Sequence, residues 1–365
     1  MLIIIKKKES FNISSNRQSY KIAILAPLPP LSGGMTQIAE SLSNNLINDG
    51  HKVIKIQLGK GLMGLFPIPT LYFQFIHNIL RCDIIHIISA SGSALWIKDL
   101  PAIIIARLFK KKVILNFVGG KALDYYPKWP WYKRLPFKWA SVVVLPTDIF
   151  VNLLKKYNPL TKFYKIPHVV DVKSFKNNHD LKKEVPILLA AKSLEDYAGF
   201  DILLDVFSSV KEKIHNAELW IVGDGPIKDD LKDQVKEMEL KDVRFFGNID
   251  HKEMPDIMQK ATIFVHASKY ESFGIVLVEA MASMLPVVSF DVGGISEVII
   301  NSKTGYLIPY RDNNEFIDKI LDLITNEKMK KELGENGIVH SEKFSWEIIR
   351  NYWYDLYSDS GLEGN

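Results

Sequence analysis

The stretch from Thr262 to Glu297 constrains the fold of this chain more than any other part of the sequence. It opens with Thr262 to Val265, a short β-branched and aromatic run suited to a buried strand. Apolar residues then recur at close to helical spacing from Gly274 to Met284, and Pro286 to Phe290 is a second apolar run of strand length. The stretch therefore predicts one strand–helix–strand unit of an α/β sheet.

Two carboxylates flank the start of the predicted helix. Glu271 lies just before it, and Glu279 lies inside it, eight residues further on. Eight helical residues span roughly 12 Å, comparable to the distance from a sugar to a ribose across a diphosphate. The first N–H groups of a helix and its positive dipole end favour an anion. The spacing therefore suits a sugar at Glu271, a diphosphate at the helix start and ribose hydroxyls at Glu279.

The same spacing also has an ordinary structural interpretation. A glutamate at a helix start is a favourable charge placement, and Glu279 would then lie on a solvated face. The setting of Glu279 argues against this, because it lies in an apolar helix between two strands that are predicted to be buried. A carboxylate in such a place needs a partner. We therefore expect that Glu279 does not face open water without one.

A wider pattern surrounds the two glutamates. It consists of Glu271, Ser272, Phe273, Gly274, Glu279, Ala280, Met281, Pro286, Val287, Val288, Gly293, Gly294 and Glu297. This pattern resembles the E-x7-E signature of the retaining glycosyltransferases of family 4, which have the GT-B fold. The resemblance implies that Glu271 contacts the donor sugar as the catalytic residue and that Glu279 binds the ribose. It also implies that the donor site includes Phe273, Gly274 and Ile275.

One position departs from the family pattern inside this stretch. Met284 stands where the family has glycine, and we expect the change to affect packing at the helix end and not the donor site. The resemblance as a whole extends over about residues 20–357.

The chain is long enough for two domains, because single cores seldom grow past about 250–300 residues. Strands and helices alternate in two blocks of the 365 residues, which predicts an α/β fold. Together with the resemblance, this gives a GT-B fold of two doubly wound Rossmann-like domains facing a cleft. We place an N-terminal extension at 1–19, an acceptor-side domain at 20–172, a charged linker at 173–184, a nucleotide-sugar-binding domain at 185–343, and a C-terminal helix that crosses back to the first domain at 344–365.

Two glycine-containing loops are further candidates for the donor site. Gly33 and Gly34 follow the first predicted strand, an arrangement that brings backbone amides near a phosphate, although a plain turn is the alternative. Lys192 ends a predicted strand ahead of Gly199, and the resemblance implies that this lysine grips the donor diphosphate. A surface lysine is the alternative. The resemblance also places Ile249 against the nucleotide base.

Two departures from the family concern the chemistry directly. Many relatives have a histidine near the reacting carbon where this chain has Val118, with Asn116 as the nearest polar side chain. Ala198 stands where the family has a second basic residue for the diphosphate. A lysine–phosphate contact is worth about 1.5–3 kcal/mol, so we expect weaker donor binding or help from another cation.

The segment from Tyr125 to Trp139 combines aromatic and basic residues. Such a combination suits an anionic membrane interface, and family acceptors are often linked to lipid. We expect peripheral membrane contact through Tyr125, Trp129, Trp131, Lys133 and Arg134. The alternative is a loop and helix whose aromatic residues pack on the domain.

Bulk composition excludes several other classes of protein. A formal net charge of +4 is too weak to argue for nucleic acid binding. Cys82 is the only cysteine and lies among apolar residues, so we expect a core residue, as we do for His86. Met1 to Ile5 precede a lysine cluster in the wrong order for a signal peptide, and no run is long enough to span a membrane. We expect a cytoplasmic protein that can lie at the inner face of the cell membrane.

These observations lead to one functional prediction. The resemblance implies a retaining, metal-independent hexosyltransferase that uses a nucleotide-diphosphate sugar, without a cofactor, and acts on a glycan or lipid-linked saccharide in surface polysaccharide synthesis. An Asp-x-Asp metal pair is not apparent, and Asp229 and Asp230 lie in a charged helix that we expect to be solvated.

Three alternatives stay open. The chain could be a catalytically impaired GT-B protein that binds an active glycosyltransferase, which is the reading that Ala198 and Val118 favour. It could be another GT-B sugar-nucleotide enzyme such as an epimerase, which the E-x7-E context disfavours. A nicotinamide dehydrogenase is disfavoured by the missing G-x-G-x-x-G pattern.

Overall fold

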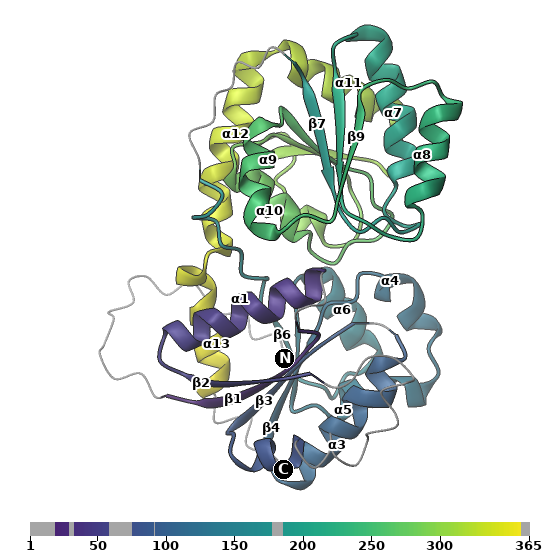
Figure 1. The fold of residues 1–365 in the computed structure, drawn as a ribbon. Helices are drawn as coiled ribbons and strands as arrows, with labels where there is room; N and C mark the ends of the chain where they lie inside the picture. The colour runs from purple at the N-terminus through teal and green to yellow at the C-terminus, as the bar shows by residue number, and fades with distance from the viewer. Residues whose placement is uncertain (1–18, 29–32, 58–74, 91, 177–184, 359–365) are drawn as a thin grey trace.

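The computed structural model describes residues 19–28, 33–57, 75–90, 92–176 and 185–358. Within these residues the chain forms two α/β domains, one above the other in Figure 1. Each domain is built on a six-stranded sheet in which the paired strands run parallel. The prediction of an α/β fold with two doubly wound domains is confirmed.

The first sheet has the strand order β2-β1-β3-β4-β5-β6. Its strands are β1 (Lys21–Leu25), β2 (Lys52–Ile56), β3 (Ile84–Ser89), β4 (Lys112–Phe117), β5 (Val142–Leu145) and β6 (Phe163–Lys165). The central strands β3, β4 and β5 are mostly apolar and are buried along almost their whole length, because helices cover both faces of the sheet. Strand addition changes direction between β1 and β3, and such a switch point opens a crevice at the carboxyl ends of the strands.

The second sheet repeats this plan with the order β12-β11-β10-β7-β8-β9. Its strands are β7 (Ile187–Ala191), β8 (Glu218–Val222), β9 (Val243–Gly247), β10 (Ile263–His266), β11 (Val287–Phe290) and β12 (Gly305–Ile308). The switch point lies between β7 and β10. Lys192 directly follows β7, and Glu271 lies in the loop after β10, so the topology brings both to the same edge of the sheet.

Helices fill the connections in both domains. The first domain has α1 (Gly34–Asn48), α3 (Leu100–Leu108), α4 (Ala122–Tyr125), α5 (Leu135–Trp139) and α6 (Asp148–Tyr157), with short turns η2 (Leu95–Asp99), η3 (Tyr126–Lys128) and η4 (Trp131–Arg134). The second has α7 (Phe200–Lys213), α8 (Lys228–Glu237), α9 (Met254–Lys260), α10 (Ile275–Ala282), α11 (Asn313–Thr325) and α12 (Glu327–Ser341), with η5 (His251–Glu253), η6 (Ile295–Glu297) and η7 (Glu342–Phe344).

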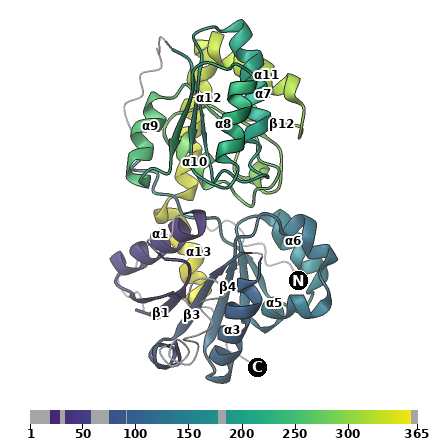
Figure 2. The ribbon, with the colours of Figure 1, turned by 45° about the vertical axis from the view of Figure 1, so that its right-hand side comes forward.

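The last helix, α13 (Trp346–Ser358), belongs to the first domain although it follows the second in sequence (Figures 1 and 2). Trp346, Trp353 and Tyr357 are buried in the same core cluster as β1 and α1. The Trp346 indole donates a hydrogen bond to Asp49, and the Lys112 ammonium donates to the carbonyls at the end of α13. The chain therefore closes the first domain with residues from its far end.

A second set of contacts joins the domains beside the cleft. The Glu297 carboxylate accepts hydrogen bonds of 2.9 and 3.0 Å from the backbone N–H groups of Asp148 and Ile149 at the start of α6, and it lies 2.7 Å from Lys165. Thr147 donates to the carbonyl of Ser272. Glu297 thus caps a helix of the opposite domain.

The predictions for individual core residues hold. His86 and Cys82 are buried, as expected, and burial lowers the pKa of His86 to about 3. α8 is a charged surface helix in which Lys232 pairs with Asp229. Residues 1–18 of the predicted extension and 177–184 of the predicted linker lie outside the described residues.

The aromatic and basic segment divides into two halves. Trp129 packs against the first-domain core, and Arg134 donates to the Trp129 carbonyl at 2.8 Å and lies over the Tyr157 ring. These two residues therefore pack on the domain, which is the alternative that the sequence analysis left open for them. Trp131, Tyr125 and Tyr132 are exposed.

Candidate active site

A cleft between the two domains forms a cavity of about 570 Å³ at the carboxyl ends of both sheets. Most of the predicted donor-site residues meet there. Lining residues include Gly33, Gly34, Lys192, Ile249, Glu271, Phe273, Gly274, Ile275 and Glu279. Residues far apart in sequence therefore surround one space that is large enough for a small ligand.

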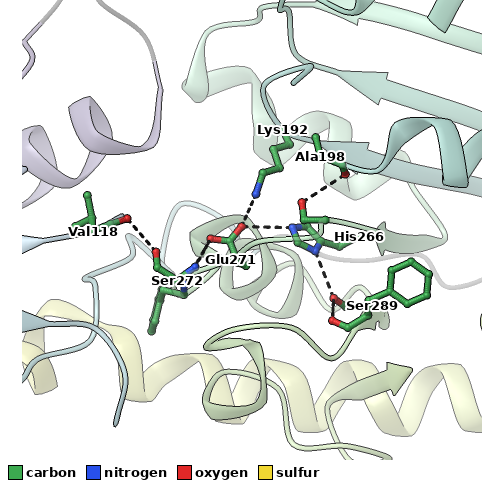
Figure 3. Close-up of polar contacts among 10 residues, drawn as sticks. Val118, Lys192, Ala198, His266, Glu271, Ser272 and Ser289 are labelled. Carbon is green, nitrogen blue, oxygen red and sulfur yellow. Dashed lines mark hydrogen bonds and ion pairs between the residues drawn. The ribbon is translucent and has the colours of Figure 1, made fainter. Parts of the chain in front are cut away.

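Glu271 lies at the centre of a charged cluster in this cavity (Figure 3). One carboxylate oxygen lies 2.5 Å from the Lys192 ammonium and 3.5 Å from Nε2 of His266. The other accepts a hydrogen bond of 3.0 Å from the backbone N–H of Ser272. The side chains of Glu271 and Lys192 are both largely buried and little hydrated, so each charge is compensated mainly by the other.

The surroundings of Glu271 keep it ionised. Burial by itself would raise the pKa of this carboxyl, but the Lys192 ammonium and the nearby His266 imidazole outweigh burial and hold the pKa well below its usual range. His266 is buried, which lowers its own pKa, and its Nδ1 lies 3.3 Å from the Ser289 hydroxyl. Glu271 is therefore a fixed anion beside a cation that an anionic ligand could attract away.

Glu279 lies in α10 and is buried, as its apolar context predicted. Its carboxylate lies 2.7 Å from Nε2 of His251, which stands at the start of η5. The hydrogen bond to Glu279 raises the pKa of His251 above its usual value. Glu279 thus has the partner that its position required, and it still lines the cavity next to Ile249.

The start of α10 separates the two glutamates. Gly274 is the N-cap residue of α10, and no side chain caps this end of the helix. The first N–H groups of α10 therefore lack a side-chain acceptor at the point where Gly274 and Ile275 line the cavity. An anion placed there would lie between Glu271 and Glu279 and within reach of the helix dipole.

Two glycines have conformations that other residues would strain. Gly199 has φ +73°, and a Cβ there would lie 2.1 Å from the Ala267 carbonyl oxygen. Gly199 does not line the cavity. Its lack of a side chain allows the close approach of two loops. Gly293 has φ +58°, and its Cβ would lie 1.9 Å from the Glu271 carbonyl oxygen, which fixes the loop that carries Glu271.

Both departures from the family pattern are visible in the structure. Val118 lines the cavity, and its carbonyl accepts a hydrogen bond from the Ser272 hydroxyl. Asn116 is buried and does not line the cavity, so it cannot take the place of the missing histidine. Ala198 is buried in the second-domain core, does not line the cavity and offers no charge to a ligand there.

Several cavity residues were not predicted from the sequence. Lys121 and Tyr197 meet across the cleft, with the Lys121 ammonium 4.1 Å from the centre of the Tyr197 ring. His168 lines the cavity against the Phe273 ring, and burial lowers its pKa to about 4, partly offset by Glu271. His251 also lines the cavity. Of these residues, only Lys121 carries a signal in the sequence, because a charged residue directly after Gly119 and Gly120 could have indicated a binding role.

Metal and membrane binding were also assessed. Among the described residues no cluster of His, Cys, Asp or Glu side chains has the composition to hold a metal ion. None of the helices in the described part of the chain combines the length and apolar character needed to cross a membrane.

The chain resembles known proteins in sequence. Residues 171–340 match the family model described as glycosyl transferases group 1. A glycosyltransferase of Methanocaldococcus jannaschii is 38% identical over 149 residues, which is 41% of each chain. An amylovoran biosynthesis glycosyltransferase of Erwinia amylovora is 24% identical over 365 residues, covering 92% of this chain and 99% of that protein.

Solved structures agree in fold. A sucrose-phosphate synthase of Thermosynechococcus elongatus superposes with a TM-score of 0.77 at 19% identity, covering 93% of this chain and 98% of the other. The Anabaena protein HepE, solved with UDP-glucose, gives 0.73 at 19% identity, covering 93% and 99%. The fold is therefore GT-B, as predicted.

The second domain carries the family relationship. Residues 171–340 form a glycosyl transferases group 1 domain. The chain spans half the length, or less, of several curated relatives that it matches.

Proposed function

We propose that this protein is a retaining glycosyltransferase of family 4 that moves a hexose-type sugar from a nucleotide-diphosphate sugar to a glycan or lipid-linked saccharide. One observation carries the proposal. Glu271 and Glu279 are both buried at one cavity, on either side of the uncapped start of α10, and each has a cationic or imidazole partner. This arrangement suits a ligand with a hydroxylated group at each end and an anion in the middle.

The nucleotide half of the donor binds to the second domain in this proposal. Its ribose hydroxyls reach Glu279, and the base packs on Ile249, which lies in the apolar cluster beside α10. The diphosphate lies at the first N–H groups of α10. Lys192 turns from Glu271 toward the phosphates, where it neutralises the charge that develops on the leaving group.

The sugar half lies at Glu271. Release of Lys192 leaves this carboxylate free to accept hydrogen bonds from sugar hydroxyls and to stabilise positive charge at the reacting carbon. The bond from that carbon to the phosphate oxygen breaks, and the acceptor oxygen attacks the same face. Because Val118 offers no side-chain base, the leaving phosphate oxygen takes the acceptor proton.

A metal is not required for these steps, because Lys192 and the helix start supply positive charge to the diphosphate. The acceptor would enter from the first domain, past Gly33 and Gly34. Relatives named for amylovoran biosynthesis and for poly(ribitol-phosphate) modification support an acceptor in surface polysaccharide synthesis. We also propose peripheral contact between the first domain and a membrane.

Donor consumption tests the proposal. The protein is incubated with UDP-, GDP- and ADP-sugars, with and without a lipid and glycan extract, and release of the nucleoside diphosphate is measured. We expect release from one nucleotide family, stimulated by the extract, with the anomeric configuration of the donor retained in the product by NMR. Glu271→Gln should lower this release by roughly 10- to 150-fold. Binding of a nucleotide sugar without release under any condition would instead favour an impaired GT-B protein that acts through a partner.

A further inference from the structure

The first domain has an exposed face of apolar and basic residues where α3 meets α5. We call it the α3–α5 face and define it by Ile104, Arg107, Leu108, Phe109, Lys138 and Trp139. Five of these residues line a surface hollow of about 420 Å³. Leu108 is 75% exposed and Trp139 is 44% exposed, although large apolar side chains usually lie inside. Figures 1 and 2 show α3 and α5 side by side, at the far end of the first domain from the second.

Positive charge surrounds this face. Between residues 100 and 147 the chain has nine lysines or arginines and a single acidic residue, Asp124. Three of these cations have partners elsewhere, namely Lys112 on α13, Lys121 in the cavity and Arg134 on Trp129. Lys110 and Lys111 follow Phe109 directly, and Lys138 lies next to Trp139 in α5. η4, which packs on α5, adds Lys133 and the 74% exposed Trp131. Exposed aromatic and aliphatic groups thus alternate with cations.

We infer that the α3–α5 face docks on an anionic lipid surface. Aromatic and aliphatic side chains enter the interface between headgroups and acyl chains, while lysines contact the anionic headgroups. A second copy of the chain fits less well, because a symmetric contact would bring the same cations together. The inference makes the proposed membrane contact specific and moves it from Trp129 and Arg134, which pack inward, to α3 and α5.

Vesicle co-sedimentation tests the inference. The full chain is mixed with vesicles of phosphatidylcholine alone or with a third phosphatidylglycerol, and the bound fraction is measured. We expect binding to the anionic vesicles at least tenfold stronger than to the neutral ones. Leu108→Ser with Trp139→Ser should weaken it at least tenfold, and Lys110→Gln with Lys138→Gln about fivefold for each charge removed. Matched variants on the second domain, Val339→Ser with Ile300→Ser and Lys236→Gln with Lys331→Gln, should bind as the wild type.

Three results would overturn the inference. The first is equal binding of the wild type to both kinds of vesicle, and the second is equal binding by the α3–α5 and second-domain variants. The third is a wild-type dimer in sedimentation velocity that the Leu108→Ser/Trp139→Ser variant no longer forms. Nucleotide binding by the same variants is measured alongside. It reports on the donor site alone, so failure of lipid binding and failure of the proposed transfer are distinguishable.

A second inference concerns the cation that Ala198 removes from the donor site. Lys121 follows Gly119 and Gly120 in the loop after β4, and so it reaches the cavity from the opposite domain. Its ammonium lies 4.1 Å from the centre of the Tyr197 ring, and that of Lys192 lies 5.7 Å from the same centre. Two ammonium groups from two domains therefore flank one aromatic ring at the cavity wall.

The two lysines differ in their partners. Lys192 pairs with Glu271 at 2.5 Å, whereas no carboxylate among the described residues pairs with Lys121, whose ammonium lies over the ring. A half-buried ammonium held on a ring face keeps its charge available to an anion. We propose that Lys121 is the second cation for the donor diphosphate. The ligand would then bridge the domains, with Lys192 on one wall and Lys121 on the other.

This inference rests on the proposed function, and calorimetry separates the two. Dissociation constants are measured for a nucleoside diphosphate and for the free nucleoside. Lys121→Met and Lys192→Met should each weaken binding of the nucleoside diphosphate by roughly 10- to 150-fold and leave binding of the nucleoside unchanged. Lys121→Arg keeps the positive charge and should bind the nucleoside diphosphate as the wild type does. Lys128→Met, an exposed lysine of the same domain, is the control. Diphosphate affinity that is lost in Lys192→Met but kept in Lys121→Met would overturn the role of Lys121 alone. A wild-type protein that binds no nucleotide would overturn both proposals.

Discussion

The two domains share one architecture but differ in what they bring to the cleft. The second domain supplies the charged side chains Lys192, Glu271 and Glu279, and the family model matches this half of the chain. The first domain supplies the glycines Gly33, Gly34, Gly119 and Gly120 and a single lysine, Lys121, beside apolar and uncharged polar residues. This contrast fits the proposed function, in which the second domain binds the nucleotide sugar and the first domain faces the acceptor.

The domains also differ in how their cores are completed. The second domain is formed by consecutive residues, whereas the first needs α13 from the end of the chain. Trp353 of α13 is buried, and its ring lies 4.8 Å from that of His86. The first domain should therefore depend on residues that follow the second domain in sequence.

The largest effect is expected when this dependence is removed. Trp353→Ala should lower the free energy of unfolding of the first domain by about 3–5 kcal/mol, because it empties a buried site. Urea unfolding followed by circular dichroism measures this loss. Trp131→Ala, which changes a 74% exposed residue of the same domain, should stay within about 0.5 kcal/mol. A loss below about 1 kcal/mol for Trp353→Ala would contradict the view that α13 completes this core.

The next effect separates the two ends of the donor. Glu271→Gln should lower transfer by roughly 10- to 150-fold, because it removes a charged hydrogen-bonding group worth about 1.5–3 kcal/mol. Binding of the nucleoside diphosphate itself should persist, since Lys192 becomes free for the phosphates. Glu279→Gln should instead weaken the binding of the nucleoside diphosphate. Calorimetry with the diphosphate and with its sugar conjugate distinguishes the two, and a reversed pattern would mean that the donor lies the other way round.

A smaller effect concerns the end of α10. Met284 has φ +61°, at the residue after the C-cap, where the N–H of Leu285 bonds to the Ala280 carbonyl. This helix ending favours glycine, because a left-handed side-chain residue costs about 1–2 kcal/mol. Met284→Gly should therefore be more stable than Met284→Ala by about 1 kcal/mol in thermal unfolding. Equal stability of the two variants would show that no strain is stored there.

The smallest effect is a pH dependence from His251. Its pKa is raised in the folded protein by Glu279, so its contribution to stability is fully present below the unfolded pKa of about 6.5. That contribution is lost as the pH rises through the higher folded pKa. The stability of the wild type relative to His251→Gln should fall by at most about 1 kcal/mol between pH 6 and 9. A rise over this range, measured by thermal unfolding, would contradict the pairing with Glu279.

Much of the fold could be predicted because local patterns are strong in this chain. The apolar strand runs and the spacing of Ile38, Leu42 and Leu46 indicate the elements directly, and all three residues are buried. The burial of Glu279 followed from its apolar neighbours. Its partner did not, because His251 is 28 residues away and only the packing of η5 beside α10 brings the two together.

The first domain was less predictable for the same physical reason. The aromatic and basic composition of residues 125–139 is the same whether a side chain packs inward, as Trp129 does, or lies exposed, as Trp131 does. Periodicity is interrupted there by prolines and short turns. The position of Lys121 in the cavity could not be predicted, because its contact is with Tyr197, which lies in the other domain.

The central claim is that the cleft binds a nucleotide-diphosphate sugar through Glu279 and the start of α10. Thermal unfolding of the wild type and of Glu279→Ala, with UDP, GDP, ADP and their sugar conjugates, tests it most directly. A ligand at 100 times its dissociation constant should add about 2.7 kcal/mol of stability. We expect this gain from one nucleotide family in the wild type and its loss in Glu279→Ala. Stability that no nucleotide changes, or a gain that Glu279→Ala keeps in full, would contradict the account.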